Sequence, residues 1–265
     1  MTPEELKKKQ EATVRRQSQR AAAVTCETIT YENEGSTHAV DVYHPDPEVF
    51  PGKRPGILFF FGGGFALGCR HAFREQAQIC AENGIVAATA DYRIYTEHGS
   101  KARDSFSDGA AVWKLFREKA DDWNMDPEKL FLSGGSAGAM IAFMCGQMTG
   151  VQPAGYVMFN PGILDDAPDA NNIVNISGAQ ADGFDVINTE SLKQGTPKML
   201  VMHGEKDHII LKNTVERFVR YGKENGVDVR LKLYPGMDHG FYNFNRSRPH
   251  FYMTIGETLS FIGED

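Results

Sequence analysis

The sequence has little cysteine and no recognisable metal-binding pattern. Its four cysteines, in a chain of 265 residues, include no C-x-x-C pair: Cys26, Cys69, Cys80 and Cys145. A chain of this length can build a core without disulfides, so we expect free and mostly buried thiols. No cluster of residues with metal-ligand spacing stands out, so no metal site is expected.

Long apolar runs and an excess of positive charge are also missing. No stretch of about 18 apolar residues occurs, so we expect no membrane span. The formal net charge is -7, which argues against nucleic acid as the main partner. The first 20 residues are charged and lack the apolar segment of a secretory signal. Taken as the full chain, the sequence therefore predicts a protein of the reducing cytoplasm.

The composition that remains is typical of one globular α/β domain. Hydrophobic residues make up 41% of the chain and charged residues 24%, which are ordinary values. Apolar runs of strand length alternate with helical patterns. This alternation predicts an α/β fold with a doubly wound, mostly parallel sheet and helices on both faces.

The individual elements can be placed by periodicity and turn residues. Residues 24–31 and 38–44 predict an antiparallel hairpin at the sheet edge, joined by a turn at 32–35. Residues 126–128 predict a turn before a strand that ends near residue 133. We expect the other strands at 56–61, 85–90, 155–159, 198–203 and 227–234, and helices at 71–83, 108–120, 209–225 and 248–262.

Two segments stand apart from this alternation. Residues 1–23 begin with a capping box that has proline at the first helical position, and they predict a basic helix ahead of a main domain, 24–265. We favour a solvated helix packed on its own domain over a lid or a dimer contact; a homo-oligomer stays open. Residues 161–196 form a short insertion with weak periodicity, and long excursions of this kind are often functional.

The stretch 134–138 reads Gly-Gly-Ser-Ala-Gly and matches G-x-S-x-G. An apolar run precedes it, and apolar residues at helical spacing follow it: Ala137, Met140, Ile141, Met144, Cys145 and Met148. Strand, tight turn and helix in this order are the setting of a nucleophile elbow, in which the turn exposes the serine. Glycine is needed because a Cβ there would meet the neighbouring strand and helix. A glycine-rich turn that holds a serine by chance is the alternative, and the context favours the elbow.

Three further loops are expected beside this elbow, because open parallel sheets bind ligands at the carboxyl ends of their strands. They are the glycine run at 62–64, the loop with Asp207 and the loop with His239. Ser136, Asp207 and His239 follow one another in the chain order of α/β-hydrolase triads.

On these motifs the sequence resembles the α/β-hydrolase serine esterases of the hormone-sensitive-lipase-like and acetyl-esterase group. Six motifs in the family's order carry the resemblance: 62–65, 91–93, 126–128, 134–138, 204–207 and 238–241. The resemblance implies an α/β-hydrolase fold and a catalytic domain over 24–265. It also implies hydrolysis of a small-molecule ester through an acyl-enzyme, without a cofactor.

The resemblance also assigns roles to residues. Ser136 is the expected nucleophile, His239 the base and Asp207 the acid that orients the base. The oxyanion is expected to be held by backbone N–H groups of Gly63, Gly64 and Ala137.

Other residues compete for these roles. The rival histidines are His71, His203 and His208, and Glu205 is the rival acid. His203 lies at the end of a predicted strand, where a structural role is more usual. His208 follows Asp207 too closely to receive its hydrogen bond. We expect Asp238 to order its loop, and Asp91 and Arg93 to form a structural pair.

Two positions depart from the family pattern. Many relatives carry a histidine before the three glycines, where this chain has Phe61, so we expect Phe61 to brace the oxyanion loop by packing. Ala139 stands where relatives often have a further glycine, a change of small expected cost.

The polar insertion and the charged N-terminal segment offer little apolar surface for a long acyl chain; Ile163, Leu164 and Ile173 can close a small pocket. We therefore predict a short-acyl esterase, with acetyl groups on carbohydrate fragments or other small alcohols as the leading substrates. Tyr95, Phe184 and Tyr242 are the aromatic residues expected to suit sugar rings. The alternatives are a generic or feruloyl carboxylesterase, a peptidase, and a non-catalytic binding module on the same fold.

Overall fold

The structure is a computed structural model, and it describes residues 24–163 and 187–264. The predicted N-terminal helix and most of the predicted insertion, including Leu164, Ile173 and Phe184, lie outside the described residues.

The described residues build one eight-stranded sheet in the order β1-β2-β4-β3-β5-β6-β7-β8. The hairpin of β1 (Thr25–Asn33) and β2 (Ser36–His44) forms one edge, and β2 is also antiparallel to β4 (Val86–Ala90). The remaining strands run parallel to β4: β3 (Arg54–Phe60), β5 (Met125–Gly135), β6 (Gly155–Phe159), β7 (Lys198–Gly204) and β8 (Val229–Tyr234). The predicted mostly parallel sheet with an edge hairpin is confirmed.

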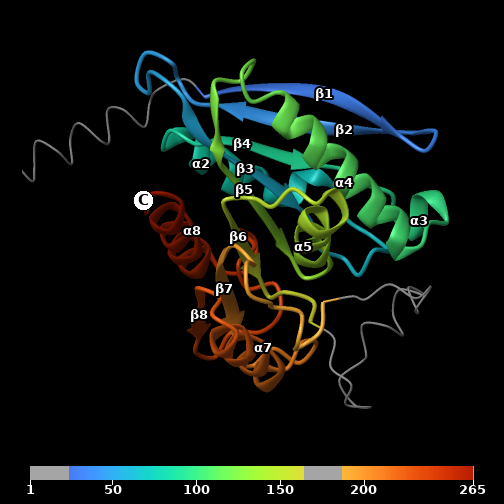
Figure 1. Cartoon of the computed structure of the whole chain (residues 1–265), viewed down its shortest axis with the longest axis vertical. Coiled ribbons are helices and arrows are strands. Elements are labelled where there is room, and N and C mark those ends of the chain that lie inside the picture. The colour runs from blue at the N-terminus through green and yellow to red at the C-terminus, as the bar shows by residue number, and fades with distance from the viewer. Residues whose placement is uncertain (1–23, 164–186, 265) are drawn as a thin grey trace, which may run out of the picture.

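Helices cover both faces of the sheet (Figure 1). One face carries α4 (Ala102–Glu118) and α5 (Ala137–Thr149), which pack against each other, while α2 (Arg74–Glu82) and α8 (Arg248–Ile262) meet on the other. The other helices are the 3₁₀ turn η1 (Arg70–Phe73), the short α3 (Tyr95–His98) and α7 (Lys212–Glu224), which packs on β7 and β8.

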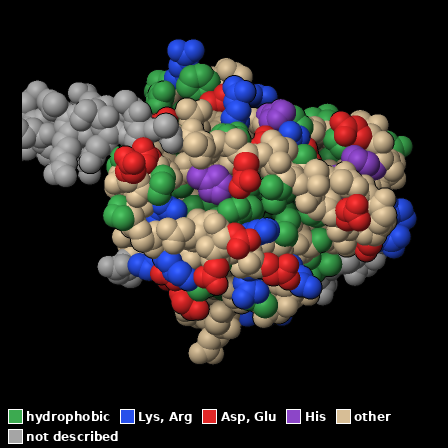
Figure 2. All heavy atoms as spheres, turned by 90° about the horizontal axis from the view of Figure 1, so that it is seen from above, with side chains coloured by type: hydrophobic (Ala, Val, Ile, Leu, Met, Phe, Trp, Pro, Cys, Tyr) green, Lys and Arg blue, Asp and Glu red, His purple; other side chains and the backbone are tan. Residues whose placement is uncertain are grey.

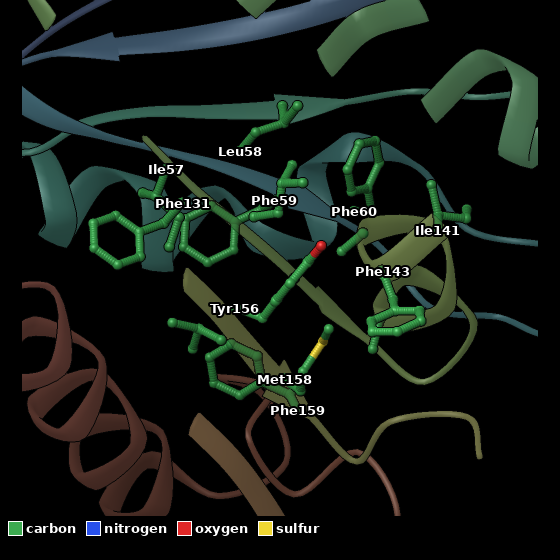
Figure 3. Packing of buried hydrophobic residues seen from close by; sticks show 14 of the residues in the cluster. Ile57, Leu58, Phe59, Phe60, Phe131, Ile141, Phe143, Tyr156, Met158 and Phe159 are labelled. Carbon is green, nitrogen blue, oxygen red and sulfur yellow. The ribbon is translucent and has the colours of Figure 1, made fainter. Parts of the chain in front are cut away.

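The core lies along the central strands, whose residues are buried on both faces as expected for parallel strands. Ile57, Leu58, Phe59 and Phe60 of β3 are inaccessible to solvent, and Figure 3 shows them beside aromatic side chains of β5 and β6. All of the first ten residues of the elbow helix α5, 137–146, are buried, so the burial is not limited to one stripe of the helix. Met148, near the end of the helix, is exposed. Helix α5 lies between the sheet and α4, so it has no solvent-facing side there.

Several predicted boundaries were wrong. Helix α4 begins six residues early, because the Asp104 carboxylate accepts from the Lys101 N–H at 2.7 Å and caps a polar first turn that has no apolar period. Helix α7 begins three residues late, because the Asp207 carboxylate accepts from the backbone N–H groups of Ile209 and Ile210. The predicted turn at 126–128 lies within β5, where the register with β3 shifts.

The cysteines are free, but only Cys80 and Cys145 are buried, while Cys26 and Cys69 are exposed. Within residues 24–163 and 187–264, no group of three or more His, Cys, Asp or Glu side chains lies together as ligands for a metal ion. None of the helices in these ranges combines the length and the apolar character needed to cross a bilayer. On the face shown in Figure 2, acidic and basic side chains are interspersed rather than gathered by sign.

Candidate active site

Ser136 occupies a strained turn between β5 and α5. Its backbone has φ 53° and ψ -119°, a region that residues with a side chain rarely adopt, and its N–H donates to the Phe159 carbonyl at 2.9 Å. Only glycine fits at Gly138, where a Cβ would lie 2.1 Å from the Phe60 carbonyl oxygen. The close approach of α5 to β3 therefore fixes the elbow and leaves the serine hydroxyl at the carboxyl edge of the sheet.

The structure brings Ser136, His239 and Asp207 together in one hydrogen-bonded chain. His239 Nε2 lies 3.0 Å from Ser136 Oγ, and His239 Nδ1 lies 2.8 Å from Asp207 Oδ2. An ionised carboxylate can only accept, so Nδ1 carries the proton and Nε2 is left to accept from the serine hydroxyl. This is the geometry of a nucleophile, a base and an orienting acid.

Asp207 is held as a carboxylate by its surroundings. Oδ1 accepts from the backbone N–H groups of Ile209 and Ile210, each at 2.9 Å, which delays the start of α7. Burial raises the pKa of the Asp207 carboxyl, but the hydrogen bonds from His239 and the Ile210 backbone, together with the electrostatic attraction of His239, lower it by more, so the net direction is down. The group is therefore ionised at neutral pH and can stabilise an imidazolium at His239.

Sequence reasoning missed Asn160. This residue follows β6 with φ 42°, is fully buried, and donates from Nδ2 to Asp207 Oδ2 at 2.8 Å. Its Oδ1 accepts at 3.3 Å from the N–H of Gly240, the residue that follows His239 in the sequence. The available signal was a polar residue at the end of a wholly apolar strand, at the edge where ligands bind.

Two of the three expected oxyanion donors, Gly63 and Gly64, line the same cavity as the serine. Gly63 and Gly64 have φ 118° and 61°, and the Gly63 carbonyl accepts from the Ala66 and Leu67 N–H groups, which turns the loop back on itself. Across the described residues, no backbone carbonyl accepts from the N–H of Gly63 or Gly64. The Ala137 N–H is the first of α5 and has no partner within the helix. Within the described part of the chain these three N–H groups have no backbone partner, so a ligand oxygen can accept from them.

A cavity of about 410 Å³ opens beside Ser136 and His239. Its other lining residues include apolar side chains and a few polar groups: Leu67, Ala72, Phe73, Ile209, Tyr242, Asn243 and Arg246. Of the aromatic residues proposed for sugar contacts, Tyr242 lines this cavity and Tyr95 is exposed elsewhere. The cavity has room for a small acyl group next to the serine.

Comparison with known proteins identifies the fold. Residues 57–187 match a family model described as alpha/beta hydrolase fold. The apo form of Thermogutta terrifontis esterase 2 superposes with a TM-score of 0.80 at 27% identity, covering 90% of this chain and 95% of that one. The chain has the α/β-hydrolase fold. The resemblance to esterases of this fold, read from the sequence motifs, is confirmed.

The other similar proteins match only part of this chain or only part of their own length. Residues 173–258 match the prolyl oligopeptidase family model. Lipase 2 of Moraxella sp. (strain TA144) is 32% identical over 92 residues, 34% of this chain and 21% of the lipase. A probable isoprenylcysteine alpha-carbonyl methylesterase of Arabidopsis thaliana is 22% identical over 238 residues, 76% of this chain and 48% of that protein. The chain thus spans less than half of the length of these curated relatives.

The Thermogutta terrifontis esterase is also described with small molecules on it. Two of its structures carry bound propionate and butyrate, with TM-scores of 0.76 and 0.75 and 26% identity. Another is phosphorylated by paraoxon, with a TM-score of 0.76.

In this chain Phe61 packs beneath the glycine loop, in place of the histidine of many relatives. Its ring stacks on Tyr92 with centroids 4.0 Å apart, and Tyr92 Oη donates to the Phe61 carbonyl at 2.6 Å. A Cβ on Gly68, at the other end of the loop, would lie 2.5 Å from the Phe61 ring. The loop therefore rests on an aromatic stack.

The rival acid and two rival histidines lie outside the hydrogen-bonded chain. Glu205 is exposed near Lys212, and His71 is exposed near Asp41. His208 Nδ1 pairs with Asp238 Oδ1 at 2.7 Å, and the same oxygen accepts from the His239 N–H. Asp238 thus orders its loop, as expected.

The predicted pair of Asp91 with Arg93 was wrong. Asp91 accepts from the backbone and guanidinium of Arg70, at 2.7 and 2.5 Å, whereas Arg93 binds Asp108 and Glu34. Side chains two residues apart on an extended chain lie on the same face but are separated along the strand. The short Asp91 side chain therefore reaches the Arg93 guanidinium less well than Asp108 does. The two residues tie different segments to the end of β4.

Proposed function

We propose that this chain is a serine carboxylesterase that hydrolyses short-acyl esters through an acyl-enzyme. The observation that carries the proposal is the hydrogen-bonded chain from Ser136 through His239 to Asp207, which opens on a cavity lined by Gly63 and Gly64. Nothing in ester hydrolysis by this route requires a cofactor.

In the proposed first step, Ser136 Oγ attacks the ester carbonyl carbon while His239 Nε2 takes the hydroxyl proton. The carbonyl oxygen becomes an oxyanion held by the N–H groups of Gly63, Gly64 and Ala137, each worth about 3 kcal/mol of barrier. The C–O bond to the alcohol then breaks, and Nε2 returns the proton to the leaving alkoxide. Asp207 stabilises the imidazolium between these two transfers.

In the second step, water replaces the alcohol. His239 Nε2 takes a proton from the water as its oxygen attacks the acyl carbon, and a second tetrahedral oxyanion forms in the same place. The bond to Ser136 Oγ breaks, the proton passes from Nε2 to Oγ, and the carboxylic acid leaves.

The size of the cavity supports a short acyl group. Leu67, Ala72 and Phe73 give it apolar walls next to Ser136 within a volume of about 410 Å³. The propionate-bound and butyrate-bound forms of the similar Thermogutta esterase support the same acyl range.

For the alcohol side we propose small polar alcohols, with acetylated carbohydrate fragments as the leading class. Asn243 and Arg246 offer hydrogen-bond donors at the cavity, and Tyr242 adds an aromatic side chain there. A generic or feruloyl carboxylesterase remains the alternative on this side.

A peptidase is the second candidate, favoured by the match of residues 173–258 to the prolyl oligopeptidase family. That match contains Asp207 and His239 but not Ser136. A non-catalytic binding module is the third candidate, and it would not use the serine at all.

The test is a series of nitrophenyl esters from acetyl to octanoyl, assayed beside acetylated oligosaccharides, a feruloyl ester and a peptide panel. The proposal predicts kcat/KM higher for acetyl than for octanoyl, no activity in Ser136→Ala, and no peptide cleavage. A preference for octanoyl would contradict the short-acyl proposal. Failure to release acetate from every acetylated oligosaccharide would contradict only its carbohydrate part.

A further inference from the structure

A buried polar pair lies against Asp207 and is not one of the three residues that exchange or orient the proton. Asn160 and His203 are both fully buried. Asn160 Nδ2 donates to Asp207 Oδ2, the same oxygen that accepts from His239 Nδ1. We propose that Asn160 and His203 act as positioning residues that fix this carboxylate and the His239 loop for proton transfer; the proposal rests on the proposed function.

His203 has one defined tautomer in this setting. Its Nε2 lies 3.0 Å from the Ile210 carbonyl oxygen, which can only accept, so Nε2 carries the proton. Its Nδ1 is then unprotonated and accepts from Asn160 Nδ2 at 3.3 Å. Burial lowers the pKa of His203 and outweighs the opposing effect of Asp207, so the ring stays neutral.

This tautomer sets the direction of the Asn160 amide. The two Nδ2 hydrogens reach Asp207 Oδ2 and His203 Nδ1, and Oδ1 accepts from the Gly240 N–H at 3.3 Å. A flipped amide would place its oxygen against the carboxylate and lose all three hydrogen bonds. The amide therefore joins the acid directly to the residue that follows the base.

The acid has no remaining freedom to rotate. Oδ1 of Asp207 accepts from the backbone of Ile209 and Ile210, and Oδ2 accepts from Asn160 and His239. Turning the carboxylate toward another partner would break several of these bonds in a buried site, where unpaired polar groups are costly. Asn160 thus helps to determine which Asp207 oxygen accepts from His239 and how the carboxylate is oriented toward the His239 ring.

The experiment measures the rate at which a fluorophosphonate labels Ser136, from pH 5 to pH 9, in the full chain. This rate reports activation of the serine whatever the natural ester is. Asn160→Gly removes the amide and still accepts φ 42°, so the backbone keeps its shape. We expect labelling to slow by roughly tenfold to a hundredfold, the effect of losing hydrogen bonds to a charged group. Asn225→Ala removes an exposed helix-end amide and should leave the rate unchanged.

Asn160→Asp adds a readout that a purely structural role would not move. Aspartate also tolerates this backbone conformation, and its protonated carboxyl can donate to Asp207 as the amide does. Once it ionises, its charge adds to that of Asp207 and holds the proton on His239. The pH of half-maximal labelling should therefore move upward.

Two substitutions of His203 test the direction of the amide. His203→Asn places an amide oxygen near the position of Nδ1, where it can accept from Asn160, whereas His203→Gln reaches toward Ile210 and leaves Asn160 without an acceptor. We expect the Asn variant to keep a rate close to wild type and the Gln variant to resemble Asn160→Gly. Equal rates in the two variants would overturn the role of His203.

NMR titration of the His239 ring separates this proposal from the proposed function, because it needs no reactive serine. An upward shift of the titration midpoint in Asn160→Asp supports the positioning role. An unchanged midpoint, or unchanged labelling in Asn160→Gly, overturns it. A wild-type protein that the probe does not label would contradict the esterase proposal, while the titration would still decide the positioning role.

Discussion

Replacement of Phe61 by alanine tests whether the oxyanion loop depends on the aromatic stack beneath it. The Phe61 ring is 2% exposed and stacks on Tyr92, so the substitution opens a cavity in a packed region. Removing a buried phenylalanine ring costs about 3–5 kcal/mol. At 2–4 °C per kcal/mol for a chain of this size, the melting temperature should fall by roughly 6–20 °C. The free donors at Gly63 and Gly64 would also lose their fixed direction, so kcat should fall by roughly tenfold or more.

The assay compares kcat per folded enzyme at a temperature well below both melting transitions. Phe116→Ala is the matched control, because Phe116 is 1% exposed, packs on Trp113 in α4 and does not line the cavity. It should lose similar stability and keep kcat. Tyr92→Phe removes only the hydrogen bond to the Phe61 carbonyl and should lie between wild type and Phe61→Ala. Equal kcat in the Phe61 and Phe116 variants would refute the bracing role, and an unchanged melting temperature would refute the packing.

Three further predictions concern pH and buried charge. The value of kcat/KM should rise from acidic to neutral pH and then level off, because only a neutral His239 can take the serine proton; a flat profile would argue against it as the base. The free energy of unfolding should fall as pH drops below about 6.5, because unfolded His203 binds a proton that the folded state, with its lowered pKa, does not. Denaturant titrations at several pH values measure this, and the unfolding free energy should change less with pH in His203→Asn than in wild type. Asp108→Ala should cost about 3–5 kcal/mol in the same titration, because Arg93 loses its buried partner; a loss below 1 kcal/mol would contradict this.

The parts of the fold that follow from local chemistry were predictable from the sequence. The elbow needs glycine where α5 approaches β3, so its spacing is visible in the chain. Strand β6 and helix α8 have the predicted bounds, because each is delimited by a clear change of periodicity. The start of α4 was missed because its first turn is held by the Asp104 cap rather than by an apolar face.

The parts that depend on contacts distant in sequence were not predictable. Asn160 lies 47 positions from Asp207 and belongs to no motif, so only the sheet brings the two together. Asp91 and Arg93 suggested a pair by their closeness in sequence, but each found a partner on another segment. Tyr95 was expected near the substrate from residue type alone, and its position on α3 leaves it exposed and away from the cavity lining.

The most direct test of the account is detection of the acyl-enzyme itself. Wild-type protein is mixed with nitrophenyl acetate, quenched in acid within the first turnovers, and examined by intact and peptide mass spectrometry. The account predicts an acetyl group on Ser136, a burst of nitrophenol that matches the enzyme concentration wherever deacylation is slower than acylation, and no adduct in Ser136→Ala. Steady hydrolysis with no acetyl group at Ser136, or an equal adduct in Ser136→Ala, would contradict it.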